Sequence, residues 1–147
     1  MKRVSDLLVL AVQIVLGYTL VHFASPWTDQ IAIKILAFAI FLLAAFVGIK
    51  ALLDLGTSFA VAPTPHSNSK FVARGIYSKI RHPMYLSVLL AALALLIAGL
   101  NLASLISFIG IAIFFALKIQ YEEKALQAKF PDYLEYKRKT GRLLPKL

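Results

Sequence analysis

Residues 83–117 read PMYLSVLLAALALLIAGLNLASLISFIGIAIFFAL and contain no charged side chain. The apolar pattern is interrupted only at Gly99-Leu100-Asn101, which is long enough for a tight turn and nothing more. Pro83 suits the first position of a helix, because its missing N–H would have no partner there. The stretch therefore predicts an antiparallel pair of apolar helices, 83–98 and 102–117. Both are short for a full membrane crossing, so we expect them to thin the bilayer locally or to lie low in it.

Two longer apolar stretches precede this hairpin, at residues 4–24 and 31–53. Lys2-Arg3 followed by an apolar run resembles the start of a signal peptide, but the run is too long and no small-x-small cleavage site follows it. We expect an uncleaved first span. The sequence thus predicts an all-α polytopic membrane protein of four transmembrane helices, with residues 1–147 as one domain.

Composition supports a membrane protein and excludes several chemistries. The 147 residues are 60% hydrophobic, with a mean hydropathy of +0.78, which leaves too little polar surface for a soluble domain of this size. The absence of cysteine excludes disulfides, thiolate nucleophiles and Cys-ligated zinc. Three scattered histidines predict no metal site. The net charge of +9 is better explained by membrane lipids and the positive-inside rule than by nucleic acid.

Basic residues indicate the orientation of the chain in the membrane. The N-terminus carries two Lys or Arg residues, the loop 54–82 carries four and the tail 118–147 carries eight, whereas the two intervening turns carry none. These three segments, and with them both termini, are expected in the cytoplasm, with a bacterial or archaeal inner membrane as the setting. The tail is expected to continue the last span as a helix to Lys129, to break at Pro131, and to form a short basic helix that ends near Gly141.

Two polar clusters stand at the cytoplasmic ends of the last two spans. Arg81-His82-Pro83-Met84-Tyr85 begins one span, and Tyr121-Glu122-Glu123 follows the other. The tight hairpin should bring them side by side. The helix N-terminus at Pro83 and the charge of Arg81 favour an anionic group, while the two glutamates favour a cation. Such a site suits a zwitterionic ligand with an additional positive centre.

The sequence from about Leu55 onward resembles the isoprenylcysteine carboxyl methyltransferase family, which is itself similar to the membrane phospholipid N-methyltransferases. The residues that carry the resemblance are Gly75-Ile76-Tyr77, Arg81-His82-Pro83-Met84-Tyr85, Glu122-Glu123, Leu126, Phe130, Tyr133, Tyr136, Arg142 and Pro145. The pairing of Arg-His-Pro-x-Tyr with Glu-Glu across one helical hairpin is more specific than either part alone.

This resemblance implies S-adenosyl-L-methionine as cofactor, with S-adenosyl-L-homocysteine as its product. It implies a cofactor site made by Arg81, His82, Pro83, Tyr85, Glu122 and Glu123, and catalytic roles for Arg142 and Glu122. Two positions depart from the family pattern. Lys118 stands where many relatives have arginine, which would weaken bidentate recognition of a carboxylate, and Leu86-Ser87 replaces a smaller residue.

The main functional hypothesis is therefore methyl transfer to a lipophilic small-molecule or lipid acceptor, such as an isoprenylcysteine carboxylate, which needs no general base. Two alternatives stay open: N-methylation of a phospholipid or another amine, with Glu122 or Glu123 as base, and a non-catalytic membrane scaffold. Structural explanations also exist for single residues: His82-Pro83 as a helix start, Arg81 as a membrane anchor, and Lys118 with Glu122, or Lys50 with Asp54, as simple helix pairs. The oligomeric state is left open.

Overall fold

The computed structural model describes residues 14, 17–19, 21–22, 29–56 and 72–146. In this part of the chain the order of elements is α2 (Ile31–Leu55), the 3-10 helix η2 (Gly75–Ser78), α3 (Pro83–Ala98), α4 (Leu102–Lys129) and α5 (Tyr133–Lys139). The described residues form no strand beyond one isolated parallel bridge, between Ile80 and Gly141, so the all-α prediction is confirmed for them. Most of the predicted first span and residues 57–71 of the central loop lie outside the described residues.

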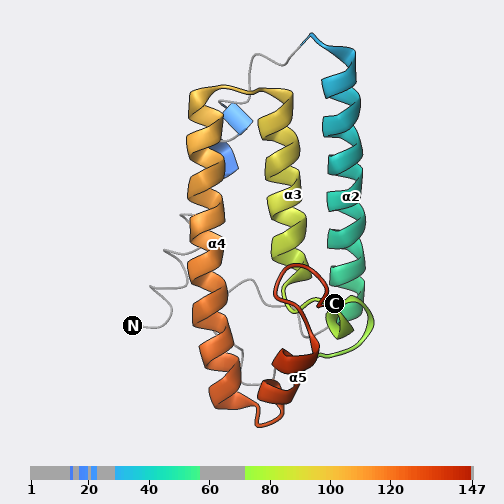
Figure 1. Ribbon diagram of the computed structural model, residues 1–147, viewed down its shortest axis with the longest axis vertical. Helices are drawn as coiled ribbons and strands as arrows, with labels where there is room; N and C mark the ends of the chain where they lie inside the picture. Colours follow the sequence, from blue (N-terminus) through green and yellow to red (C-terminus); the bar gives the residue numbers. More distant parts are fainter. Residues whose placement is uncertain (1–13, 15–16, 20, 23–28, 57–71, 147) are drawn as a thin grey trace.

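The three long helices stand side by side and alternate in direction (Figure 1). α3 lies in the middle, and the lower part of α4 extends beyond the ends of its two neighbours, where α5 lies beside it. The beginning of α3, the end of α2 and the C-terminal segment therefore meet at one end of the bundle.

α2 packs closely against α3 through small residues. Its buried positions are Ala37, Ala44, Val47 and Ala51. A Cβ atom added to Gly48 would lie 2.7 Å from the Ser87 hydroxyl of α3, so the two backbones approach closely at this point. Such small-residue contacts are typical of helix pairs in membranes, where packing replaces the hydrophobic effect as the main attraction.

The opposite faces of these helices expose large apolar side chains. On α2 the exposed hydrophobic residues are Ile31, Ile35, Leu36, Phe38, Phe41, Leu42, Leu43, Phe46, Ile49, Leu52 and Leu53. By length and composition, α2 and α4 are able to cross a membrane, whereas α3, with 16 residues, is apolar but shorter. Among the predicted spans that the structure describes, the second and the fourth are thus long and apolar enough to cross a membrane, and the third is shorter.

A capping box makes the turn between α3 and α4. The Asn101 side chain accepts a hydrogen bond of 2.9 Å from the Ser104 amide, and the Asn101 amide donates one of 3.2 Å to the Ser104 hydroxyl. Reciprocal bonds of this kind satisfy amide groups that a helix start would otherwise leave unpaired. α4 then runs without interruption past the apolar segment 102–117 to Lys129, as the sequence predicted for the helical extension. Ala92 of α3 packs with Ile111 and Phe115 of α4 in the core of this pair.

The chain after α5 folds back against the start of α3. Gly141 lies between two residues of the earlier segment: its amide donates to the Lys79 carbonyl (3.0 Å) and its carbonyl accepts from the Arg81 amide (2.9 Å). The His82 amide donates to the Arg142 carbonyl over 3.1 Å. Through these bonds the C-terminal segment is joined to the residues that begin α3, and its side chains reach the ends of α3 and α4.

Candidate active site

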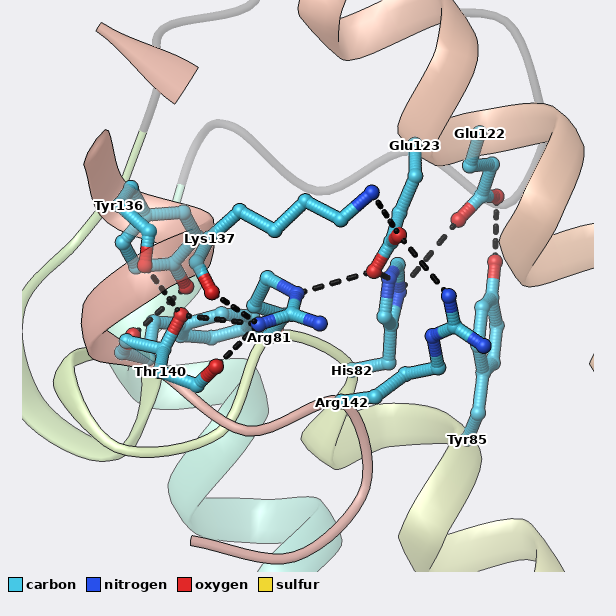
Figure 2. Close-up of polar contacts among 10 residues, drawn as sticks. Arg81, His82, Tyr85, Glu122, Glu123, Tyr136, Lys137, Thr140 and Arg142 are labelled. Atoms are coloured by element: carbon cyan, nitrogen blue, oxygen red, sulfur yellow. Dashed lines mark hydrogen bonds and ion pairs between the residues drawn. The ribbon is translucent and has the colours of Figure 1, made fainter. Parts of the chain in front are cut away.

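Three segments contribute side chains to one polar cluster at this end of the bundle (Figure 2). The first turn of α3 contributes His82, its N-cap, and Tyr85, with Arg81 just before it. α4 contributes Glu122 and Glu123, which lie beyond its apolar segment. The C-terminal part contributes Lys137, Thr140 and Arg142.

Glu123 is a buried carboxylate surrounded by the positively charged side chains of this cluster, and its own side chain is only 3% exposed. Its Oε1 atom lies 2.9 Å from Arg81 Nε and 3.5 Å from His82 Nε2. Its Oε2 atom lies 3.1 Å from Lys137 Nζ and 3.3 Å from Arg142 Nη2. Burial alone would raise the pKa of Glu123, but contacts with His82, Arg81 and Lys137 outweigh it and hold this pKa well below its usual range.

Arg81 is enclosed by protein and connects Glu123 to the C-terminal segment. Its Nη1 atom donates to the Thr140 carbonyl, to the Lys137 carbonyl over 3.1 Å and to the Thr140 hydroxyl over 3.3 Å. The side chain is 7% exposed. A simple membrane anchor would keep its charge in water, so that interpretation of Arg81 is wrong. Its guanidinium instead holds the tail and neutralises Glu123.

Glu122 lies in quite different surroundings. Its Oε1 atom accepts a hydrogen bond from the Tyr85 hydroxyl, and its Oε2 atom lies 3.7 Å from His82 Nδ1. Burial raises the pKa of Glu122, and the contacts with Tyr85, His82 and Lys118 only partly oppose this shift. The adjacent carboxyl groups therefore differ: Glu123 is held as an anion, whereas Glu122 is closer to accepting a proton.

An aromatic stack runs from the cluster into the apolar core. The rings of His82 and Tyr85 are stacked with centroids 5.5 Å apart, and Tyr85 stacks on Phe115 at 4.9 Å. Lys118 Nζ lies 5.0 Å from the centre of the Tyr85 ring, within the range of a cation–π contact. Lys118 is buried, with 6% of its surface exposed, so its interpretation as half of a solvated helix pair with Glu122 is wrong.

The residues singled out from the sequence come together at this site. The structure gathers Arg81, His82, Pro83, Tyr85, Glu122, Glu123 and Arg142 around the ends of α3 and α4. Sequence reasoning missed Lys137 and Thr140. Lys137 is one of three consecutive basic residues, and nothing in the sequence distinguishes it from the other two. In the part of the chain that the structure describes, no group of three or more His, Asp or Glu side chains is arranged to hold a metal ion.

Comparison with known proteins identifies the class to which these helices and this cluster belong. The profile of the isoprenylcysteine carboxyl methyltransferase family matches residues 35–128, more than half of the chain. The chain belongs to this family. The match begins within α2, earlier than the residues that carry the resemblance in the sequence, and it ends before the tail, so that Lys137, Thr140 and Arg142 lie beyond it.

Two curated proteins illustrate the similarity. The protein-S-isoprenylcysteine O-methyltransferase of Saccharomyces cerevisiae is 38% identical over 94 residues, which are 61% of this chain and 39% of that protein. The cobalt-zinc-cadmium resistance protein CzcN of Cupriavidus metallidurans is 37% identical over 84 residues, which are 54% of this chain and 38% of that protein. The chain thus covers less than two fifths of the length of either relative.

Proposed function

We propose that this protein is an S-adenosylmethionine-dependent methyltransferase of the membrane that acts on a lipophilic acceptor. The observation that carries the proposal is the buried contact of Tyr85 and His82 with Glu122 and Glu123, which lies within the part of the chain that matches the family. It joins the ends of two apolar helices, where a water-soluble cofactor is able to meet an acceptor that resides in lipid.

The residues of the cluster fit the chemical groups of this cofactor. In the described part of the chain, His82 Nε2 is buried and makes no hydrogen bond, although it lies near Glu123. The carboxylates of Glu122 and Glu123 suit an ammonium group. Lys137 and Arg142 are 35% and 48% exposed at the edge of the cluster and are able to exchange Glu123 for the carboxylate of a ligand. The stacked ring of Tyr85 offers an aromatic surface.

S-adenosylmethionine, when bound, supplies a methyl group carried on a positively charged sulfur atom. The protein itself has to bind the cofactor, to orient the methyl group toward the acceptor and to exclude water from the site. A buried carboxylate favours a positively charged sulfur over a neutral one, so Glu122 would contribute to binding the methyl donor more strongly than the product, whose sulfur is uncharged. A carboxylate acceptor needs no proton removed, and alignment in a site protected from water is then the main source of acceleration.

Lys118 is our candidate for recognition of an acceptor carboxylate. It lies where the apolar segment of α4 ends, and it contacts the Tyr85 ring on the core side of Glu122. An acceptor whose apolar tail lies along α3 and α4 would bring its charged end to this depth. A lysine supplies one compact positive charge there rather than the planar fork of an arginine.

A second candidate is methylation of a lipid amine, and the raised pKa of Glu122 favours it. An amine must lose a proton before it attacks a methyl group, and a carboxylate with a raised pKa is a better base for this purpose.

In the proposed membrane arrangement, the chain crosses the bilayer four times, with both termini and the cluster on the cytoplasmic side.

The test is methyl transfer from isotopically labelled S-adenosylmethionine by the full chain in detergent micelles or liposomes. We expect label in an N-acetylated S-farnesylcysteine, less in phosphatidylethanolamine, and none in either acceptor with His82→Ala. Glu135→Ala is a matched control, because Glu135 forms an exposed pair with Lys139 outside the cluster, and its loss should leave transfer unchanged. Labelling of phosphatidylethanolamine alone would favour the second candidate. If neither acceptor is labelled and the protein does not bind the cofactor, the remaining interpretation is a non-catalytic scaffold.

A further inference from the structure

Asp54, in the last turn of α2, joins this helix to the segment that leads into the candidate active site. Its Oδ2 atom accepts a hydrogen bond of 2.7 Å from the Ile76 amide, and its Oδ1 atom accepts one of 2.7 Å from Lys50 Nζ. The Asp54 carbonyl also accepts a bond of 3.4 Å from Arg74 Nε. The Asp54 side chain is 14% exposed, compared with 47% for Lys50.

The stability of α2 does not explain an acidic residue at this position. Negative charge near the C-terminus of a helix interacts unfavourably with the helix dipole. The ion pair with Lys50 is partly exposed and spans one helical turn, and such pairs contribute little to stability. The contact that requires an acceptor here is the one with Ile76, because its backbone amide donates to a side-chain oxygen at this position.

The backbone at Gly75 is shaped around the Asp54 carboxylate. Gly75 has a φ angle of +57°, which residues with a side chain rarely adopt. A Cβ atom added to Gly75 would overlap both oxygen atoms and the carboxyl carbon of Asp54. The chain therefore turns at a glycine that lets the carboxylate lie directly against the backbone, with the Ile76 amide pointing at it.

From Ile76 the chain is held continuously up to the site. The Tyr136 hydroxyl of α5 donates to the Tyr77 carbonyl over 2.6 Å. Ile80 forms the bridge with Gly141, and the next two amides bond to the C-terminal segment. Residues 75–82 are thus fixed by Asp54 at their start and by the tail at their end, and they deliver Arg81 and His82 to Glu123.

We infer that Asp54 is a positioning residue for the candidate cofactor site. It anchors residues 75–82 to α2 through the Ile76 amide and so fixes where Arg81 and His82 stand. This inference rests on the proposed function only for its effect on cofactor binding. The anchoring itself is measurable without any ligand.

The bond to Ile76 needs an acceptor oxygen, and it does not need the negative charge. Asp54→Asn keeps such an oxygen and should keep the segment in place, whereas Asp54→Ala removes it. Where only part of the population holds a binding-competent arrangement, apparent affinity falls by the same fraction. We expect Asp54→Ala to weaken binding of S-adenosylhomocysteine about tenfold, the effect of losing about 1.4 kcal/mol. Asp54→Asn should remain within about twofold of the wild type.

The experiment compares the wild type, Asp54→Ala, Asp54→Asn and Glu135→Ala as full chains in detergent. Glu135 is a matched control, because it also pairs with a lysine four residues away but anchors no distant segment among the described residues. Hydrogen exchange of amides 76–82 reports the anchoring, and calorimetric titration with S-adenosylhomocysteine reports the site. Asp54→Ala should lose exchange protection in residues 76–82 and lose affinity, while the other two variants should behave like the wild type.

The other possible results contradict either the anchoring by Asp54 or its positioning role. Unchanged protection of amides 76–82 in Asp54→Ala would overturn the inference, whatever its affinity. Lost protection with unchanged affinity would overturn the positioning role, as would equal losses in Asp54→Asn and Asp54→Ala. If the wild type itself binds no S-adenosylhomocysteine, the proposed function fails, and so does any role of Asp54 in it; the exchange data then decide the anchoring alone.

Discussion

Glu122 and Glu123 are adjacent in α4, yet their carboxylates lie in opposite electrostatic surroundings. Glu123 lies among Arg81, Lys137 and Arg142, while Glu122 accepts a hydrogen bond from the neutral Tyr85 hydroxyl. One carboxylate is thus mainly used to hold segments of the protein together. The other accepts a hydrogen bond from a neutral hydroxyl at its Oε1 atom and is better placed to act on a ligand.

Replacing Glu123 by glutamine should destabilise the fold. The change removes the charge that compensates buried Arg81, and leaving one partner of a buried pair uncompensated costs about 3–5 kcal/mol. Thermal unfolding in detergent, followed by circular dichroism, measures the loss. Glu135→Gln disrupts an exposed pair and should cost far less, so equal losses in the two variants would contradict the central role of Glu123.

The pH dependence of stability should distinguish the two glutamates. The pKa of Glu123 is lowered in the folded state, so its stabilising contribution is complete above its ordinary value of 4.5 and disappears as the pH falls below it. The deficit of Glu123→Gln should therefore shrink below about pH 4.5. The pKa of Glu122 is raised in the folded state, so the contribution of its carboxyl group to stability falls as the pH rises from 4.5 through the raised pKa. Glu122→Gln should gain stability relative to the wild type over the same rise, and unfolding curves from pH 3 to 8 test both signs.

Removing the Tyr85 hydroxyl should impair turnover more than folding. Tyr85→Phe keeps the stacking on His82 and Phe115 but releases Glu122 from its hydrogen bond. We expect kcat/KM to fall about tenfold, corresponding to about 1.4 kcal/mol, and the free energy of unfolding to change by about 1 kcal/mol. Initial rates and unfolding curves of the same preparation measure both. A variant with full activity would show that the orientation of Glu122 does not matter.

Lys118 should determine whether a charged acceptor is used. Lys118→Met keeps an apolar side chain of similar length and removes the cation, so kcat/KM for a prenylcysteine carboxylate should fall about 10- to 100-fold. Its methyl ester analogue, which has no carboxylate, serves as a competitive ligand whose inhibition constant should change much less. Lys118→Arg should retain most of the activity. Equal loss of affinity for both ligands would point to a general defect in the site instead.

The sequence was sufficient to predict most of the helices and much of the cluster. A continuous apolar stretch, Pro83 at a helix start and a short turn at Asn101 are local signals, and they determine which ends of α3 and α4 lie together. Once that hairpin is placed, the polar clusters that contain Tyr85 and Glu122 are expected side by side, and the structure adds the hydrogen bond between these two residues.

Other contacts depend on long-range folding that leaves no local signal. The bridge between Ile80 and Gly141 joins positions about sixty residues apart, and it decides that Arg81 turns inward to Glu123 and to backbone carbonyls of the tail. The sequence pattern gives equal weight to every lysine and arginine near the membrane, so it could not distinguish buried Lys118 from exposed ones. The spacing of Lys50 and Asp54 allows a helix pair, and the two residues form it, but nothing in the sequence indicates the second bond of Asp54, to Ile76.

Calorimetric titration of S-adenosylmethionine into the purified full chain in detergent decides whether the polar cluster is a cofactor site. We expect saturable binding to one site per chain, weakened in both Glu122→Ala and His82→Ala and retained in Glu135→Ala, with all variants folded by circular dichroism. If the folded wild type does not bind, or if none of these changes affects binding, the cluster does not hold this cofactor.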